Sequence, residues 1–89
     1  MNQIQHDENI PNRLLRLTSV KTYSGLPRST LYYRIAQGLW TRPVKLSARC
    51  VGWPVNEVAA LNAACIAGKS NDEIRALVKQ LEISRKSVV

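Results

Sequence analysis

Acidic side chains are missing from the middle of this 89-residue chain. No Asp or Glu occurs from residue 9 to residue 56, a stretch that carries eight Lys or Arg side chains. A surface built from this stretch has no carboxylates of its own to neutralise the positive charge, so it attracts polyanions. The formal net charge of the whole chain, +7, has the same sign. Nucleic acid is therefore the first partner to consider.

Side chains that perform catalysis or bind metals are also scarce. His6 is the sole histidine, and the two cysteines, Cys50 and Cys65, do not form a CxxC pair. The sequence therefore offers no zinc site and no nucleophile with a base beside it. We expect a protein without enzymatic activity, cofactor, metal or small-molecule ligand. A disulfide is geometrically open, but we expect two buried thiols that pack as small hydrophobic groups in a reducing compartment.

Long hydrophobic runs are absent as well. The longest apolar region, 58–67, is far shorter than the ~20 residues that a membrane-spanning helix requires. The first twelve residues contain acids and amides where a signal peptide has a basic region and an apolar run. We expect a cytoplasmic protein with no membrane partner. Its expected organisation is a flexible leader at 1–12, one domain at 13–83 and a frayed tail at 84–89.

Glycine and proline divide the first half of the domain into short elements. RLLRL (13–17) alternates leucine with arginine and predicts a short extended piece. Thr18 is the expected N-cap of a helix over 19–24, in which Val20 and Tyr23 share a face, and Gly25 ends this helix.

A second helix follows Pro27, which cannot continue the first one. Its Leu31 and Ile35 are expected to face inward, and Gly38 ends it. Two short helices joined by a glycine-containing turn predict a helix-turn-helix.

The next segment changes to β-forming residues. VKL (44–46) and CVGW (50–53) predict a two-stranded hairpin with Arg49 at its tip. A hairpin that directly follows the second helix of a helix-turn-helix is a wing. Trp40 and Trp53 stand among apolar neighbours at element ends, so we expect them to anchor the hairpin in the core rather than to stack on bases.

Two further helices complete the domain. The first covers 54–67 and ends at Gly68, and the second starts with the capping-box pattern S-x-x-E at Ser70–Glu73. The short connection predicts an antiparallel pair. The sequence thus predicts a mainly α fold with a small β-hairpin, namely a winged helix-turn-helix followed by a C-terminal helical hairpin.

An apolar stripe on the last helix allows two interpretations. Its members recur at i, i+3, i+4 and i+7: Ile74, Leu77, Val78 and Leu81. The stripe packs on the preceding helix, or it binds a helix of a partner protein and the basic region is incidental. We favour packing within the chain.

The outer face of the second helix is polar, aromatic and cationic when Leu31 points inward. Such side chains suit a recognition helix, because base edges are read by hydrogen bonds and the neighbouring phosphates are held by Arg, Ser, Thr or Tyr. The alternative is that the tyrosines are half-buried packing residues and the arginines are solvated. The candidates for groove contact are Arg28, Ser29, Thr30, Tyr33 and Gln37, and those for phosphate contact are Tyr32 and Arg34. In the wing, Arg42, Lys45 and Arg49 are candidates for phosphate contact, unless they serve only the solubility of the hairpin.

The stretch SGLPRSTLYYRI, together with PVKL and VGW, resembles the AlpA family of small phage and mobile-element regulators, a group of MerR-like winged helix-turn-helix proteins. The PVK-bearing hairpin is also similar to that of small phage excisionases. Pro27 departs from the family pattern, because many members have a Ser there that can cap the recognition helix.

The resemblance implies a protein that binds double-stranded DNA without a cofactor, at the control region or attachment site of an integrated element. Two roles share this scaffold, namely excisionase and transcriptional regulator. We favour the excisionase, in which several copies self-associate on DNA and an integrase performs the excision.

Overall fold

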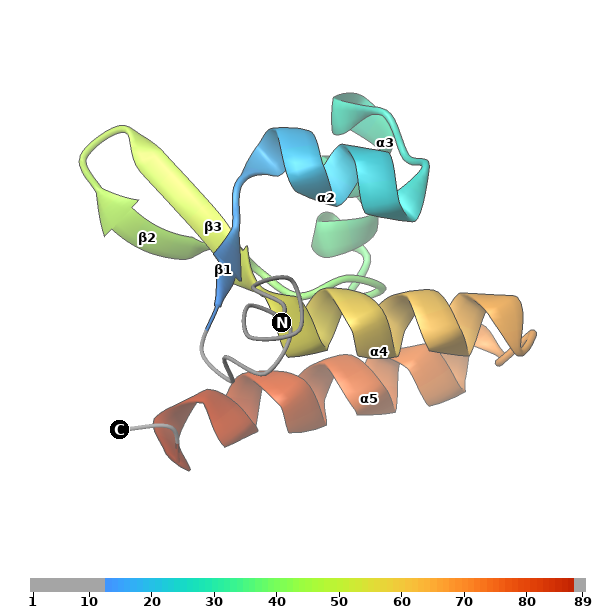
Figure 1. Ribbon diagram of the computed structural model, residues 1–89. Helices are drawn as coiled ribbons and strands as arrows, with labels where there is room; N and C mark the ends of the chain where they lie inside the picture. Colours follow the sequence, from blue (N-terminus) through green and yellow to red (C-terminus); the bar gives the residue numbers. More distant parts are fainter. Residues whose placement is uncertain (1–12, 88–89) are drawn as a thin grey trace, which may run out of the picture.

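Three short strands precede or connect the helices in the computed structural model, which describes residues 13–87 (Figure 1). Expectations that concern residues 1–12 and 88–89 lie outside the described residues. The elements in chain order are β1 (Leu14–Leu15), α2 (Leu17–Ser24), α3 (Arg28–Ala36), β2 (Val44–Ser47), β3 (Cys50–Pro54), α4 (Val55–Ile66), α5 (Asn71–Ser84) and a 3-10 turn, η1 (Arg85–Ser87). The winged helix-turn-helix predicted from the sequence is confirmed.

Helix α2 begins two residues earlier than the sequence predicted. Its N-cap is Arg16, whose side chain makes no capping hydrogen bond. Thr18, the predicted cap, lies inside the helix, where its carbonyl oxygen accepts a hydrogen bond of 3.0 Å from Thr22 Oγ1. Leu17 packs against the core one helical turn before the fully buried Val20. Burying both apolar residues on one face therefore outweighs the gain from a side-chain cap.

The turn between α2 and α3 forms at the predicted residues. Gly25 ends α2 with φ of 73°, a left-handed conformation that favours glycine. Pro27 is the N-cap of α3 and has no side chain that could accept a hydrogen bond, so α3 starts without a side-chain cap. Leu31 is fully buried and Ile35 packs against the core, as predicted, whereas Tyr23 on α2 is 60% exposed.

The wing has a third strand that the sequence did not predict. β3 pairs antiparallel with β2 on one side and with β1 on the other, so the strand order is β1-β3-β2. Leu14 lies opposite Pro54, and Leu15 lies opposite Trp53. The extended piece predicted at 13–17 is thus the base of the wing, and only two of its residues are strand. Leu15 is buried there, which ties the start of the domain to its centre.

Helices α4 and α5 lie side by side and run in opposite directions below the helix-turn-helix (Figure 1). The predicted capping box is present: Ser70 Oγ accepts from the Glu73 N–H at 3.2 Å, and the Ser70 N–H donates to Glu73 Oε1 at 2.9 Å. These hydrogen bonds lower the pKa of the Glu73 carboxyl group. Ile74 and Val78 are buried, and Leu77 and Leu81 pack against the same core. The apolar stripe therefore packs within the chain and is not available to bind a helix of a partner protein.

The two tryptophans occupy the centre of the molecule, as predicted. Trp40 is 1% exposed and Trp53 is fully buried. Trp53 Nε1 donates a hydrogen bond of 2.9 Å to the carbonyl oxygen of Thr41. The prediction of two buried thiols is wrong for Cys65, which is exposed; Cys50 is half-buried, and both are free thiols.

Candidate nucleic-acid interface

Helix α3 presents an exposed polar face from its first residue onward. Leu31 is its one fully buried residue, so the positions that point the other way are open to solvent. Tyr33 is 64% exposed, which means that most of its ring is available for contact. The five groove-contact candidates are all exposed on this face: Arg28, Ser29, Thr30, Tyr33 and Gln37. Their contact with bases stays a prediction.

Tyr32 and Arg34 occupy the two flanks of α3 and are half-buried. The ring of Tyr32 meets that of Trp53 edge to face, with centroids 6.3 Å apart and an interplanar angle of 71°. The Arg28 guanidinium carbon lies 5.2 Å from the centre of the Tyr32 ring. Arg34 Nη2 approaches Cys65 Sγ at 3.9 Å on the other flank. Tyr32 therefore links the helix to the wing while it positions Arg28.

The wing directs Lys45 toward the same side of the molecule as α3. Lys45 lies opposite Val51 in the β2–β3 pairing, and residues opposite each other share a face of the sheet. Because side chains alternate along a strand, Val51 and Trp53 share that face too. Since Trp53 contacts Tyr32 of α3, Lys45 extends from the face of the wing that adjoins the recognition helix.

The other two basic candidates lie at opposite ends of the wing. Arg49 is in the two-residue turn between β2 and β3, at the tip, as predicted. Arg42 lies two residues before β2, in the segment that enters the wing, and its side chain is exposed. The wing candidates are therefore spread from base to tip rather than gathered at one point.

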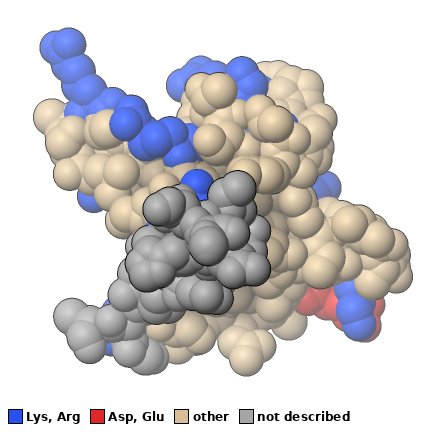
Figure 2. Space-filling view, in the orientation of Figure 1, with Lys and Arg blue, Asp and Glu red and all other residues tan. Residues whose placement is uncertain are grey.

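Charge is divided between the elements of the fold. In the part of the chain that the structure describes, every carboxylate lies on α4 or α5: Glu57, Asp72, Glu73 and Glu82. Ion pairs within residues 13–87 join Arg75 to Asp72 and Arg85 to Glu57, and none involves a basic side chain of α2, α3 or the wing. Figure 2 shows blue side chains over the wing and the top of the helix-turn-helix. The red side chains lie at the right of the view, where α4 ends and α5 begins.

The comparisons with known proteins agree with this arrangement. The model of the family described as prophage CP4-57 regulatory protein (AlpA) matches residues 13–62, from the strand at the base of the wing into α4. The chain belongs to the AlpA family. A protein of Enterobacteria phage P4, ORF88, is 40% identical to this chain over 57 residues, which are 64% of this chain and 65% of the phage protein. No solved structure matches.

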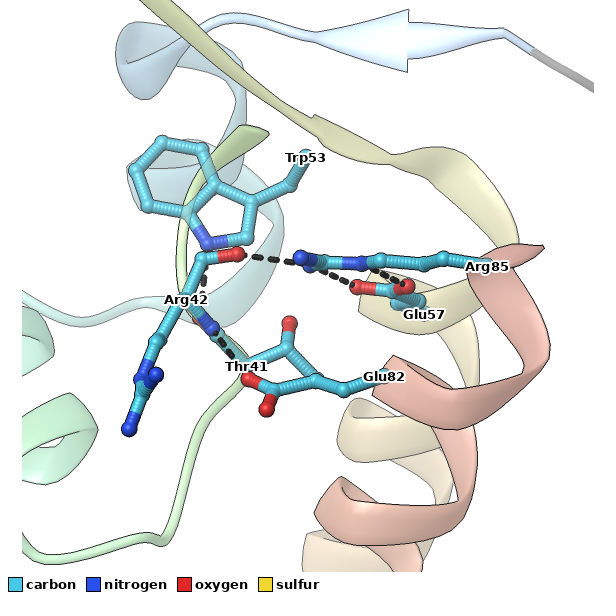
Figure 3. Close-up of polar contacts among 6 residues, drawn as sticks. All are labelled: Thr41, Arg42, Trp53, Glu57, Glu82 and Arg85. Atoms are coloured by element: carbon cyan, nitrogen blue, oxygen red, sulfur yellow. Dashed lines mark hydrogen bonds and ion pairs between the residues drawn. The ribbon is translucent and has the colours of Figure 1, made fainter. Parts of the chain in front are cut away.

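The match to the AlpA model ends before α5, yet residues of α5 and η1 hold the base of the wing (Figure 3). Glu57 is 1% exposed, and Arg85 donates to it from Nε to Oε2 and from Nη2 to Oε1, each at 2.7 Å. This hydrogen-bonded pairing raises the pKa of Arg85. Arg85 Nη2 also donates to the carbonyl oxygen of Arg42 at 2.6 Å, and the Arg42 N–H donates to Glu82 Oε2 at 2.8 Å.

The sequence did not predict this cluster, and Arg85 was expected to lie in a frayed tail. The structure differs, because α5 continues through Ser84 and Arg85 begins the 3-10 turn that follows. No local pattern connects Glu57 with a residue 28 positions later. The one signal in this AlpA sequence is that Glu57 is the first acid after the acid-free stretch. Figure 3 shows that the Arg42 side chain points away from Glu57 and Glu82. Glu82 and Arg85 bind the backbone N–H and carbonyl groups of Arg42 and leave its guanidinium free.

None of the helices that the structure describes is long and apolar enough to cross a bilayer. Within residues 13–87, no three side chains of His, Cys, Asp or Glu gather closely enough to hold a metal ion.

Proposed function

We propose that this AlpA-family protein binds double-stranded DNA at the attachment site of an integrated element and acts there as an excisionase. The observation that carries the proposal is the single acid-free surface formed by α3 and the adjoining face of the wing. Its positive charge has no carboxylate partner among the described residues, so its Lys and Arg side chains are free to neutralise phosphates and release the counterions condensed on the DNA. The match to a family described as a prophage regulatory protein supports the assignment to an integrated element.

The geometry suits a helix in the major groove, which is about 12 Å wide and admits an α-helix. Arg28, Ser29 and Thr30 occupy the first turn of α3, and the first residues of a recognition helix reach deepest. Lys45 and Arg49 on the wing then meet the phosphates of the adjacent backbone. Phosphate contact sets the register, and the first turn of α3 reads the bases.

The choice of excisionase over transcriptional regulator follows from how the protein gains affinity. The apolar stripe of α5 is used inside the chain, so it does not form a dimerisation helix. Adjacent copies bound side by side then supply the additional affinity, and such an assembly bends DNA for an integrase. Regulation of the promoter of the element is the second candidate, and the regulatory description of the family favours it.

A paired binding and excision experiment separates the two candidates. The protein is titrated in bandshift assays against the attachment site and the promoter of the element, and excision by the integrase is measured with and without it. We expect binding at the attachment site and excision that depends on the protein. Promoter binding with unchanged excision would assign the regulator role instead.

The salt dependence of binding tests the interface itself. If four to six basic side chains meet phosphates, the plot of log affinity against log salt concentration has a slope of about −4 to −5 per protomer. We expect Arg28→Ala to relax the sequence preference and Lys45→Ala to weaken binding to specific and unrelated duplexes alike. Bandshift titrations of the three proteins on both duplexes measure this. A slope near zero for the unaltered protein would contradict an electrostatic interface.

A further inference from the structure

A hollow of about 260 Å³ lies beyond the carboxyl-terminal end of α3, and basic side chains from two separate segments line it. Arg42 comes from the segment before the wing, and Arg75 and Lys79 come from α5. Every polar side chain that lines it, apart from Glu82, is a hydrogen-bond donor. This set of groups matches an anion with several acceptor oxygens.

Arg75 is fixed against the end of the recognition helix. Its Nε donates a hydrogen bond of 2.9 Å to the carbonyl oxygen of Gln37, and its side-chain atoms come within 3.7 Å of the position that a Cβ on Gly38 would occupy. The distance from Arg75 Nη1 to Asp72 is 3.7 Å, and Asp72 is 98% exposed, so that ion pair is weak. The guanidinium therefore has N–H groups available beside α3.

Lys79 stands four residues after Arg75, and like charges at this spacing on a helix repel each other. No carboxylate among the described residues pairs with Lys79. Glu82 lines the same hollow, but its Oε2 already accepts a hydrogen bond from the Arg42 N–H. A hydrogen bond from a backbone N–H does not neutralise Glu82, so Glu82 and Asp72 offset part of this repulsion, and a bound anion would offset more of it.

We infer that Arg42, Arg75 and Lys79 form a second phosphate-binding surface, which contacts the DNA backbone beyond the carboxyl-terminal end of α3. The inference rests on the proposed DNA binding. DNA is favoured over an acidic protein because Arg75 donates to the carbonyl oxygen of Gln37, an exposed residue directly after α3. Arg75 and Lys79 lie outside the residues matched by the AlpA model, so this surface enlarges the interface beyond the family region.

The test compares two double variants of the full chain that lose the same charge. Arg75→Ala/Lys79→Ala removes the surface, and Lys69→Ala/Lys86→Ala removes two exposed lysines elsewhere. Bandshift titrations over a series of salt concentrations give the affinity and the slope for each. We expect the first variant to bind roughly tenfold more weakly, with a slope smaller in magnitude by about 1 to 2, and the second to resemble the unaltered protein.

A further variant guards against a folding defect, since Arg75→Ala also removes the hydrogen bond to Gln37. Lys79→Gln breaks no hydrogen bond or ion pair seen among residues 13–87, and we expect it to reduce the slope by about 1 without changing the thermal midpoint. Equal slopes for both double variants would overturn the inference while DNA binding stands. If the unaltered protein fails to bind duplex DNA, the proposed function falls and this surface with it. Binding of an acidic peptide in place of DNA would likewise overturn it.

Discussion

Replacing Arg85 with Ala is expected to lower the free energy of unfolding by about 3–5 kcal/mol, because it leaves the Glu57 carboxylate buried without a partner. Glu57 is 1% exposed, and within the described chain both of its oxygens depend on Arg85 for hydrogen bonds. Breaking such a pair costs more than the pair itself contributes, since the remaining charge stays desolvated. Urea unfolding followed by circular dichroism measures the change.

The matched control for this prediction is Lys86→Ala, one residue further along. Lys86 is exposed and we expect its loss to change stability by less than about 0.5 kcal/mol. Arg85→Lys keeps the charge but not the planar fork, so it should fall between the two. Equal stability of the Ala variants at 85 and 86 would show that the ion pair does not hold the domain together.

The same pair has a pH consequence. Its hydrogen bond to Glu57 raises the pKa of Arg85 above its ordinary value. A raised pKa stabilises the folded state at every pH below the unfolded value, and the gain is lost only as the pH rises through the folded value. Arg85 therefore keeps its charge across the neutral and moderately alkaline range, and its contribution to stability does not change there.

Replacing Trp53 with Ala is expected to destabilise the domain by about 3–5 kcal/mol, because it opens a cavity where the wing meets the helices. Trp53 is fully buried, contacts the Tyr32 ring and donates to the Thr41 carbonyl oxygen. A domain of this size has a total stability of the same order, so a large unfolded fraction at 37 °C is expected. Thermal and urea unfolding give the magnitude.

Tyr33→Ala is the control that separates stability from binding. Its ring is 64% exposed, so we expect a change in stability within about 0.5 kcal/mol, whereas DNA binding should weaken. The two aromatic residues thus have opposite expected profiles. A Trp53→Ala protein as stable as the unaltered one would mean that the wing does not depend on this contact for its position.

These predictions share a structural reason, namely that contacts at the base of the wing fix its position against α3. Glu82 and Arg85 bind the N–H and carbonyl groups of Arg42, the residue at which the chain enters the wing. Trp53 then sets the wing against α3 through Tyr32. The relative position of α3 and the wing therefore depends in part on residues outside the region that the AlpA model matches.

The sequence by itself determined the features that depend on local chemistry. Gly25 and Pro27 set the turn before α3, Ser70 and Glu73 start α5, and the spacing of Leu31 and Ile35 decides which face of α3 is exposed. The acid-free stretch likewise assigned the positive charge to α3 and the wing, because the charged residues that each segment contains can be read directly from the sequence. These signals span a few residues and need no knowledge of the rest of the fold.

Only the tertiary structure decided what depends on residues far apart in the chain. The pairing of Leu15 with Trp53 made a strand from a piece too short to be stable alone, and the burial of Leu17 moved the start of α2. Glu57 and Arg85 have no spacing that links them, and Arg75 reaches Gln37 across 38 positions. Such contacts follow from the packing of α5 against the core. No local pattern predicts them, because the residues that meet are separated by long stretches of chain whose closure depends on the whole fold.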